Sequence, residues 1–596
     1  MITKMFYERK STARPHSPAP NLAHSPARRG IMSAFPVSSR KTPLVLVLLT
    51  LFLLAACKPQ PQGPGDEYFG NFTPVNPGAE SLGAPADWYS DARFYHIWVN
   101  AFSDSDGDGI GDIPGIVNRL DYLEDLGINA IWLSPIFETK GQDYPQGNMH
   151  GYDTTDHYEI NPYFGDTEDV RNLLDQAHSR GIRVIFDFVP NHVSTQHPWF
   201  QYSVENSGGY GDWFVWEYED LDNYYDGPWG QEVWHRASNG RYYYGVFWDG
   251  MPDLNYENPE VRESMASVVT HWLNFGFDGI RVDAVKYVYE QDTDDNPRTA
   301  PIMEDTAATR EYFAELREKI LDHYGYRGFG KFMVVENWTN TDKLDTYAEF
   351  NGRAAAQMSF DFDLGGTIFY SLSGGSPAAL SSYLSTRDSY DMPSDFRYGN
   401  FLSNHDNVRS RPMTETGDNT ETAKMAAAYN ILLPGVPFVY YGNEVGMTGA
   451  AGDDIDLRQD LNWADVTSQT GDSSSLLEWY RALLTARKNY DELGGGQFTD
   501  VSSEASNGNI FAGLWQDAAS DTAVLFVGNH NSSGVTPESM NLSGYLSGVG
   551  SGVTTIIGSD NGAGFSSGSF TSGTIAGRTV KVYVLGSGSE PVLLAP

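Results

Sequence analysis

Acidic and imidazole side chains follow directly after four short apolar stretches of the chain. One such residue could simply cap a helix or pair with a neighbour. Four such groups favour a functional role over a structural one. Charges brought together where strands converge cost desolvation free energy, so they are better explained by chemistry than by stability. The polar residues that end these stretches are Asp187, Asn191, His192, Arg281, Asp283, Glu336, Asn337, Asn404, His405 and Asp406.

Three of these carboxylates suit the cleavage of a glycosidic bond. That reaction needs a proton donor for the leaving oxygen and a second carboxylate facing the cationic carbon. Arg281 stands two residues before Asp283, hence on the same face of a strand, and should lower its pKa so that it stays ionised as the nucleophile. Glu336 follows two valines, and this apolar approach should favour a retained proton. We expect the third carboxylate and two donors to sugar hydroxyls to be Asp406, His192 and His405.

A second acidic group lies in a glycine-rich loop. Its carboxylates stand at alternate positions, a spacing that lets several oxygens converge on a hard cation such as Ca²⁺. The loop is not an EF-hand, because its twelfth position is Gly115 rather than glutamate. The alternative is a solvated acidic turn. The acids of the loop are Asp104, Asp106, Asp108 and Asp112.

Strand-like apolar runs alternate with helical periods from residue 94 onward. This alternation predicts an α/β fold, a (β/α)8 TIM barrel with its active site at the carboxyl ends of the strands. The eight expected strands are 94–102, 129–136, 183–189, 278–283, 332–336, 358–363, 398–404 and 437–441. Amphipathic helices are expected at 116–126, 261–275, 308–323, 422–433 and 476–488.

Two regions interrupt this alternation. After the third strand, residues 199–248 contain 17 aromatic residues in 50 and show no helical period, so they indicate an inserted lobe whose rings form a small core of its own or line a cleft. After residue 490, short alternating runs separated by Gly and Ser predict an antiparallel β domain. We therefore expect a barrel of residues 89–192 and 256–491, an insertion at 193–255 and a C-terminal β-sandwich at 492–596.

The same segments, in this order, resemble the signature regions of the α-amylase family, glycoside hydrolase family 13. The resemblance also covers 251–255, 111–135 and 150–153, and spans about two thirds of the chain. It implies Asp283 as nucleophile, Glu336 as general acid/base and Asp406 as the carboxylate that stabilises the transition state. Residues implied to bind substrate are His150, Tyr152, His192, Arg281, Lys286 and His405, and the implied calcium ligands are Asp104, Asp106, Asp108, the carbonyl of Ile110, and Asp112.

The resemblance also bears on linkage. Relatives that cleave α-1,6 bonds often have valine after the nucleophile, whereas this chain has Ala284, and exo-acting relatives often have aspartate where Met149 stands. Both features favour a retaining enzyme that cleaves internal α-1,4-glucosidic bonds of starch or maltodextrins. Cyclomaltodextrinase, neopullulanase-like and 4-α-glucanotransferase activities remain alternatives, as does a noncatalytic glucan-binding lipoprotein, although the latter predicts a lost carboxylate.

The N-terminal region is typical of export. An apolar run at 44–56 follows Arg40 and Lys41 and is too short to span a bilayer comfortably. Its ending at Cys57 resembles a bacterial lipobox, which implies lipidation; the alternatives are a secretory signal that happens to end in cysteine, or a membrane anchor. We expect a signal peptide at 1–56, with Met32 as an alternative start, and a flexible Pro- and Gly-rich tether at 57–88. Because Lys58 is not the aspartate associated with inner-membrane retention, outer-membrane or cell-surface attachment is favoured.

Composition and charge exclude some partners. Lys and Arg number 39 against 78 Asp and Glu, a net charge of −39 that repels phosphate backbones and anionic lipids. Nucleic acid is therefore not expected, and membrane contact is expected only through the lipid anchor. We expect a monomer that binds an α-glucan.

Overall fold

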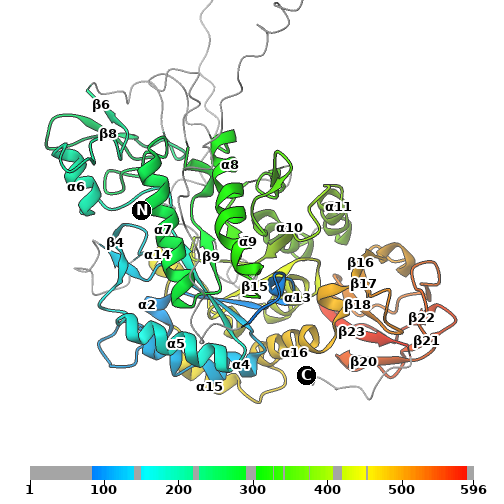
Figure 1. The fold of residues 1–596 in the computed structure, drawn as a ribbon. Helices are drawn as coiled ribbons and strands as arrows, with labels where there is room; N and C mark the ends of the chain where they lie inside the picture. The colour runs from blue at the N-terminus through cyan, green and yellow to red at the C-terminus, as the bar shows by residue number, and fades with distance from the viewer. Residues whose placement is uncertain are drawn as a thin grey trace, which may run out of the picture. The chain divides into compact units, whose positions relative to one another are not determined.

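The computed structural model describes residues 83–139, 150–218, 227–289, 304–326, 328–339, 343–374, 376–406, 419–450 and 454–586. Within these residues eight parallel strands close into a barrel in the order β1-β15-β14-β13-β10-β9-β5-β2 (Figure 1). The barrel strands are β1 (Phe94–Ile97), β2 (Ala130–Leu133), β5 (Arg183–Phe188), β9 (Gly279–Val282), β10 (Phe332–Val335), β13 (Met358–Asp361), β14 (Arg397–Asn400) and β15 (Val436–Tyr440). The predicted (β/α)8 barrel is confirmed.

The barrel strands are nearly continuous runs of buried residues, because side chains alternate between two apolar layers. One set points into the barrel, where Phe94, Trp132, Phe332, Phe360 and Phe438 belong to one buried cluster. The alternate set packs outward against the helices. This arrangement leaves the carboxyl ends of the strands as the place where polar side chains can meet.

Helices surround the strands in Figure 1. Their starts follow ordinary capping chemistry: the Asp166 side chain forms a capping box at α5, and Asn258 caps α7 with proline at the first position. The main helices are α3 (Ile113–Val117), α4 (Leu120–Leu126), α5 (Thr167–Ser179), α7 (Pro259–Phe275), α8 (Ala307–Leu316), α9 (Asp322–Gly325), α10 (Phe362–Leu372), α11 (Pro377–Arg387), α13 (Thr420–Leu432), α15 (Trp463–Gln469) and α16 (Leu476–Asn489).

Several predicted strands end earlier than expected, and in two of them the remaining residues belong to a helix. The first ends at Ile97, and its expected continuation forms a short buried helix, α2 (Val99–Phe102). The sixth ends at Asp361, whose side chain accepts a hydrogen bond from the Leu364 amide and so begins α10. In both places an apolar run without a clear period fits a strand and a buried helix equally well.

The predicted insertion lies between β5 and α7. Three short strands, β6 (Trp216–Glu217), β8 (Tyr242–Tyr244) and β7 (Trp234–Arg236), form its antiparallel sheet, in that order. A small cluster that includes Val233, Trp234, Tyr244 and Val246 is fully buried. One helix, α6 (Pro198–Val204), was not expected from the sequence.

The C-terminal region is antiparallel, as predicted. A five-stranded sheet has the order β16-β17-β18-β23-β20, and a three-stranded sheet has the order β19-β22-β21. Side chains of both sheets share one buried core. The strands are β16 (Gln497–Asp500), β17 (Ile510–Gln516), β18 (Ala523–Asn529), β19 (Met540–Asn541), β20 (Val553–Ile557), β21 (Gly564–Ser566), β22 (Ser569–Thr571) and β23 (Thr579–Leu585).

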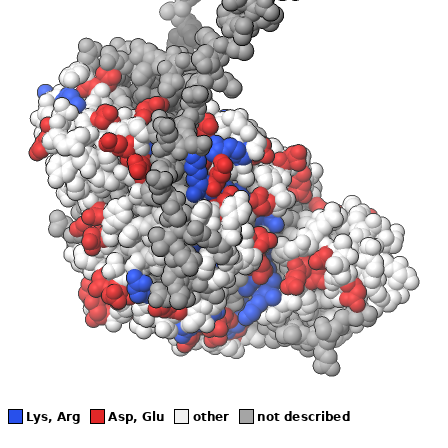
Figure 2. All heavy atoms as spheres, viewed as in Figure 1, with Lys and Arg blue, Asp and Glu red and all other residues white. Residues whose placement is uncertain are grey.

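The expected signal peptide, Cys57 and nearly all of the tether lie outside the described residues, as does Met149. Among the helices that the structure describes, none combines the length and the apolarity needed to cross a bilayer. On the face drawn in Figure 2, acidic side chains are scattered over the surface and are not gathered into a single patch.

Candidate active site

The register of the neighbouring strands β5, β9 and β10 brings Asp187, Asp283 and Glu336 together. Asp187 on β5 is paired with Arg281 on β9, and β10 lies on the other side of β9. The amides that follow continue this pattern: Asp283 N donates to the Phe188 carbonyl and Glu336 N donates to the Val282 carbonyl, both at 2.9 Å. Side chains distant in sequence therefore leave the barrel at one level and on one face.

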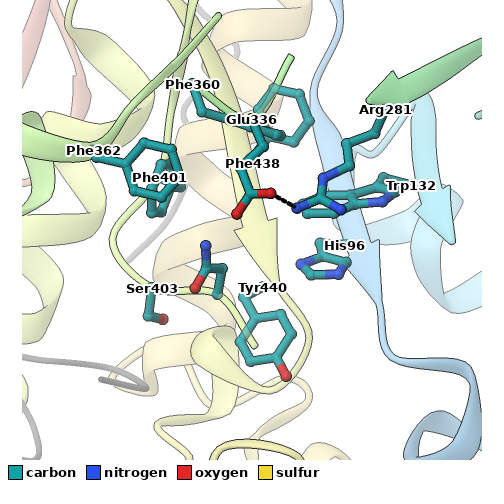
Figure 3. A pocket seen from close by; sticks show the side chains of 11 residues that line it. His96, Trp132, Arg281, Glu336, Phe360, Phe362, Phe401, Ser403, Phe438 and Tyr440 are labelled. Carbon is teal, nitrogen blue, oxygen red and sulfur yellow. Dashed lines mark ion pairs between the residues drawn. The ribbon is translucent and has the colours of Figure 1, made fainter. Parts of the chain in front are cut away.

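Arg281 is the centre of this arrangement. Its Nη1 lies 2.7 Å from Asp187 Oδ1 and 2.7 Å from Asp283 Oδ1, and its Nη2 lies 2.8 Å from Glu336 Oε2. The ion pair with Glu336 is drawn in Figure 3, where the guanidinium lies beside Trp132. Only 2% of the arginine side chain is exposed. One buried cation thus holds three carboxylates.

The backbone after β9 fixes Glu336 further. Ala284 adopts a left-handed conformation with φ of 47°, uncommon for a residue with a side chain. In this conformation its amide donates to Glu336 Oε2 at 3.0 Å. The residue next to the expected nucleophile therefore positions the expected proton donor.

Asp406 is held from the opposite side. His405 Nε2 lies 3.0 Å from its Oδ2, and Arg458 Nη2 lies 3.1 Å from its Oδ1. Although burial opposes ionisation, the charges of His405 and Arg458 outweigh it and hold the pKa of Asp406 well below its usual range. Asp406 is an anion at any physiological pH.

Tyr152 joins the two halves of the site. Its hydroxyl lies 2.8 Å from His405 Nε2 and donates to Asp187 Oδ2 at 3.3 Å, while its ring stacks on His405 at 5.6 Å between centroids. His150 Nδ1 accepts from the Tyr152 amide at 3.0 Å, and His192 Nε2 lies 3.1 Å from the Tyr152 carbonyl. All three expected histidines thus contact this tyrosine.

Lys286 is buried and pairs with residues other than the carboxylates around Arg281. Its Nζ donates to the Trp338 carbonyl at 3.1 Å and forms an ion pair with Glu304 at 2.5 Å. The ammonium is thereby anchored to the main chain of Trp338, a residue that is 39% exposed.

Burial dominates the protonation of the carboxylates around Arg281. It raises the pKa of Glu336 to about 7, although Arg281 acts in the opposite direction, and the negative charges of Asp283 and Asp406 raise it further. Burial also raises the pKa of Asp283 and of Asp187, and Arg281 lowers both without cancelling the effect. Arg281 therefore acts on Asp283 in the expected direction, but the expected net lowering of its pKa is wrong.

Chemically, the site combines a buried carboxyl able to keep a proton near neutral pH, Glu336, with a nearby carboxylate that stays ionised, Asp406. The family model described as the alpha amylase catalytic domain matches residues 96–464, which include all of these groups. The chain belongs to the α-amylase family. That membership confirms the predicted resemblance.

Relatives within the α-amylase family have several activities in their names. Alpha-amylase 3 of Dictyoglomus thermophilum is 35% identical over 381 residues, covering 63% of this chain and 68% of that protein. Trehalose synthase/amylase TreS of Mycolicibacterium smegmatis is 31% identical over 527 residues, covering 75% and 83%. Among solved structures, the alpha-amylase from H. orenii has a TM-score of 0.69 and 28% identity and covers 83% of this chain and 99% of its own.

In this α-amylase family member, three residues with contacts in the site were not assigned a role from the sequence. Asp187 is among the polar residues that end the apolar stretches, but no chemical role followed from its position alone. Trp132 lies inside the second strand, where it donates from Nε1 to Asp187 Oδ2 at 3.2 Å. Arg458 follows α14 (Asp454–Leu457) and ends no strand, so no sequence signal indicated it.

The acidic loop brings only part of the expected ligand set together. Oxygens of Asp104, Asp106 and Asp108 lie within 4.8 Å of one another. Asp112 is not among these three: its Oδ1 accepts the Gly115 amide and caps α3, and its Oδ2 accepts from Ser105. Three exposed carboxylates are a suitable donor set for a hard cation. Coordination by Asp112 and by the carbonyl of Ile110 stays a prediction.

Proposed function

We propose that this protein is a retaining glycoside hydrolase that cleaves internal α-1,4-glucosidic bonds of starch, maltodextrins or related α-glucans. One observation carries the proposal: Asp283 and Glu336 are bound by the two forks of the same guanidinium, and Asp406 lies close enough for its charge to raise the pKa of Glu336. This is the set of two working carboxylates and one stabilising charge that an oxocarbenium-like transition state requires.

In the first step, Glu336 protonates the leaving oxygen while Asp283 attacks the anomeric carbon. Arg281 holds Oδ1 of Asp283, so attack falls to Oδ2, and Arg281 and the Ala284 amide hold Oε2 of Glu336, so the proton is carried on Oε1. The raised pKa of Glu336 supports its role as acid. The product is a covalent glycosyl ester on Asp283 and a released chain end.

In the second step, Glu336, now a carboxylate, removes a proton from water, and the water oxygen displaces Asp283 from the anomeric carbon. Two displacements on one carbon retain its configuration. Both oxygens of Asp406 are bound by cations or imidazole, so this residue is suited to stabilise the positive charge rather than to attack. Tyr152 supplies the stacking face next to it.

Transfer to a sugar acceptor is the second candidate, because a relative that covers three quarters of this chain is named a trehalose synthase/amylase. Cyclomaltodextrinase or neopullulanase-like specificity shares the same chemistry. Chromatography of products from amylose, pullulan and a cyclodextrin over time distinguishes these candidates. Hydrolysis within amylose gives a ladder of short maltodextrins. Trehalose or lengthened chains as the main products would instead identify a transferase.

We propose Ca²⁺ as the cation of the acidic loop, held by Asp104, Asp106 and Asp108. The ion would hold the loop that follows α2 in one conformation and would take no part in the chemical steps. Chelation is expected to lower the melting temperature and to release bound calcium. An unchanged melting temperature together with no calcium in the purified protein would contradict this assignment.

We propose further that the mature protein begins at Cys57, carries a lipid there, and is attached as a monomer to the outer membrane or cell surface. The apolar run before Cys57 and the Pro- and Gly-rich residues after it support this location. A tether of about 30 residues would let the catalytic domain reach polymeric substrate away from the membrane.

A further inference from the structure

A groove on the outside of the barrel lies between α10 and α11. The two helices are packed side by side and are joined by a short connection, so they run antiparallel (Figure 1). Small and hydroxyl-bearing side chains form most of the walls, and three aromatic residues line the groove. The lining residues are Phe362, Asp363, Gly366, Thr367, Tyr370, Ala379, Ser382, Tyr383 and Thr386.

This groove shares a lining residue with the active-site pocket. Phe362 lines both, because α10 begins directly where β13 ends at the catalytic face of the barrel. Figure 3 shows its ring at the edge of the pocket next to Phe401. The Trp338 ring stacks on Phe362 with centroids 4.9 Å apart and planes 13° apart. Trp338 and Phe362 therefore form an aromatic surface at the edge of the pocket.

A second ring stands further along the same helix. Tyr370 is 62% exposed and follows Phe362 by eight residues, a rise of about 12 Å along an α-helix. Between the two rings, Gly366 and Thr367 give a shallow floor. Two aromatic faces separated by hydroxyl groups match a chain of sugars, whose rings are apolar on their faces and polar at their edges.

We propose that this groove is a binding site for an α-glucan chain, so that the part of a long substrate that leaves the active site lies between α10 and α11 and stacks on Tyr370. The proposal rests on the proposed function and adds to it a preference for long glucan chains over short ones. The lining residues include the acid Asp363 and no Lys or Arg, which disfavours an anionic ligand such as nucleic acid or a phospholipid. Hydroxyls of Thr367, Ser382 and Thr386 would pair with those of the sugar.

The test compares a long and a short substrate. Tyr370→Ala is expected to lower the ratio of kcat/KM on amylose to kcat/KM on a maltotriose-length substrate by about fivefold, the loss of roughly 1 kcal/mol of ring stacking. Thr367→Glu, which places a charge in the floor, should lower the same ratio. Tyr326→Ala is the matched control, because Tyr326 is 88% exposed and lies on another helix end. It should leave the ratio unchanged.

Failure of the groove and failure of the proposed function are distinguishable. Turnover of the short substrate reports on the hydrolase itself, whereas the ratio reports on the groove. If the short substrate is cleaved but both groove variants keep the wild-type ratio, the groove does not bind glucan. The same conclusion follows if Tyr326→Ala lowers the ratio as much as Tyr370→Ala does. In Asp283→Asn protein, weaker amylose binding after Tyr370→Ala would support the proposal independently of turnover.

Discussion

At the scale of single residues, the site is governed by an imbalance of charge. Arg281 faces three buried carboxylates, so one guanidinium cannot keep all of them ionised without cost. The imbalance is expressed as raised pKa values at Glu336, Asp283 and Asp187, whereas Asp406 has its own cation in Arg458. By raising the pKa of Glu336, burial keeps a proton on the residue that must protonate the leaving oxygen.

This imbalance predicts a pH profile. As pH rises through about 7, Glu336 loses the proton that it must donate, so kcat/KM on glucans should fall on the alkaline side. As pH falls, Asp283 takes up a proton at a pH higher than usual and can no longer attack, which gives an acid limb close to neutrality. A bell-shaped profile centred near neutral pH is expected.

A variant assigns the alkaline limb. Fluoride needs no proton when it leaves, so first-turnover fluoride release from α-maltosyl fluoride by Glu336→Gln should show no alkaline limb. Persistence of that limb in the variant would mean that another group carries the proton.

Asp187 is predicted to be a positioning residue. Asp187→Asn removes one of the three anions on Arg281 and the acceptor shared by Trp132 and Tyr152. We expect kcat to fall by about 10- to 100-fold with a smaller change in KM, and the acid limb to shift, because the remaining carboxylates lose a negative neighbour. Asp278→Asn is the control: Asp278 is equally buried on the other end of the same strand pair and binds His178. If it reproduces both the loss of kcat and the shifted limb, the role of Asp187 is merely structural.

At the scale of elements, the strands decide the geometry. β9 carries both Arg281 and Asp283, and its hydrogen bonds with β5 and β10 set the level of Asp187 and Glu336. Its first residue, Gly279, has no room for a side chain: an added Cβ would lie 2.3 Å from the Phe332 carbonyl oxygen. The spacing between the nucleophile and the acid therefore depends on a close backbone contact at the far end of the strand.

Gly279→Ala tests this dependence. The clash is with backbone, so β9 must shift relative to β10, and we expect a loss of stability of about 1–3 kcal/mol or more together with reduced kcat. Thermal unfolding and kinetics on a short substrate measure the two effects. Gly508→Ala, at a position with nothing within 4 Å of the added Cβ, should change neither. Wild-type stability of Gly279→Ala would contradict the close packing described for this strand.

Elements with a local sequence pattern, and the residues that end them, could be predicted from the sequence. All eight barrel strands were predicted, because buried β-rich runs bounded by polar residues are a short-range signal. The first strand was extended too far and α6 was missed, since rings without aliphatic neighbours show no helical period in residues 198–204. Arg458 was missed for a different reason: its pairing with Asp406 spans 52 residues and is purely tertiary.

At the scale of the whole molecule, the catalytic barrel is supported by the C-terminal domain. Trp515 Nε1 donates to the Leu432 carbonyl at 2.8 Å, and the Tyr429 hydroxyl lies 2.7 Å from His530 Nε2. Both contacts are to α13, the helix that precedes β15. The domain therefore buries a helix of the barrel and is expected to be required for its stability.

The proposed location is also a property of the whole chain. Cys57→Ala is expected to move the protein from the membrane fraction to the soluble fraction with unchanged kcat on maltodextrins, since the tether separates the anchor from the site. The intact mass of the wild-type membrane form should exceed that of the chain from residue 57 onward by its acyl groups. An unmodified mass of the wild-type membrane form would exclude lipidation at Cys57.

The proposed mechanism depends most on Asp283 acting as the nucleophile, and trapping of the covalent intermediate tests this directly. In Glu336→Gln protein given α-maltosyl fluoride, the first step needs no acid, but the second lacks its base, so the ester should accumulate. Mass spectrometry of the digested protein should find one maltosyl group on the peptide that contains Asp283. Fluoride release without any adduct, or an adduct on another residue, would contradict the assignment of Asp283 and the retaining mechanism built on it.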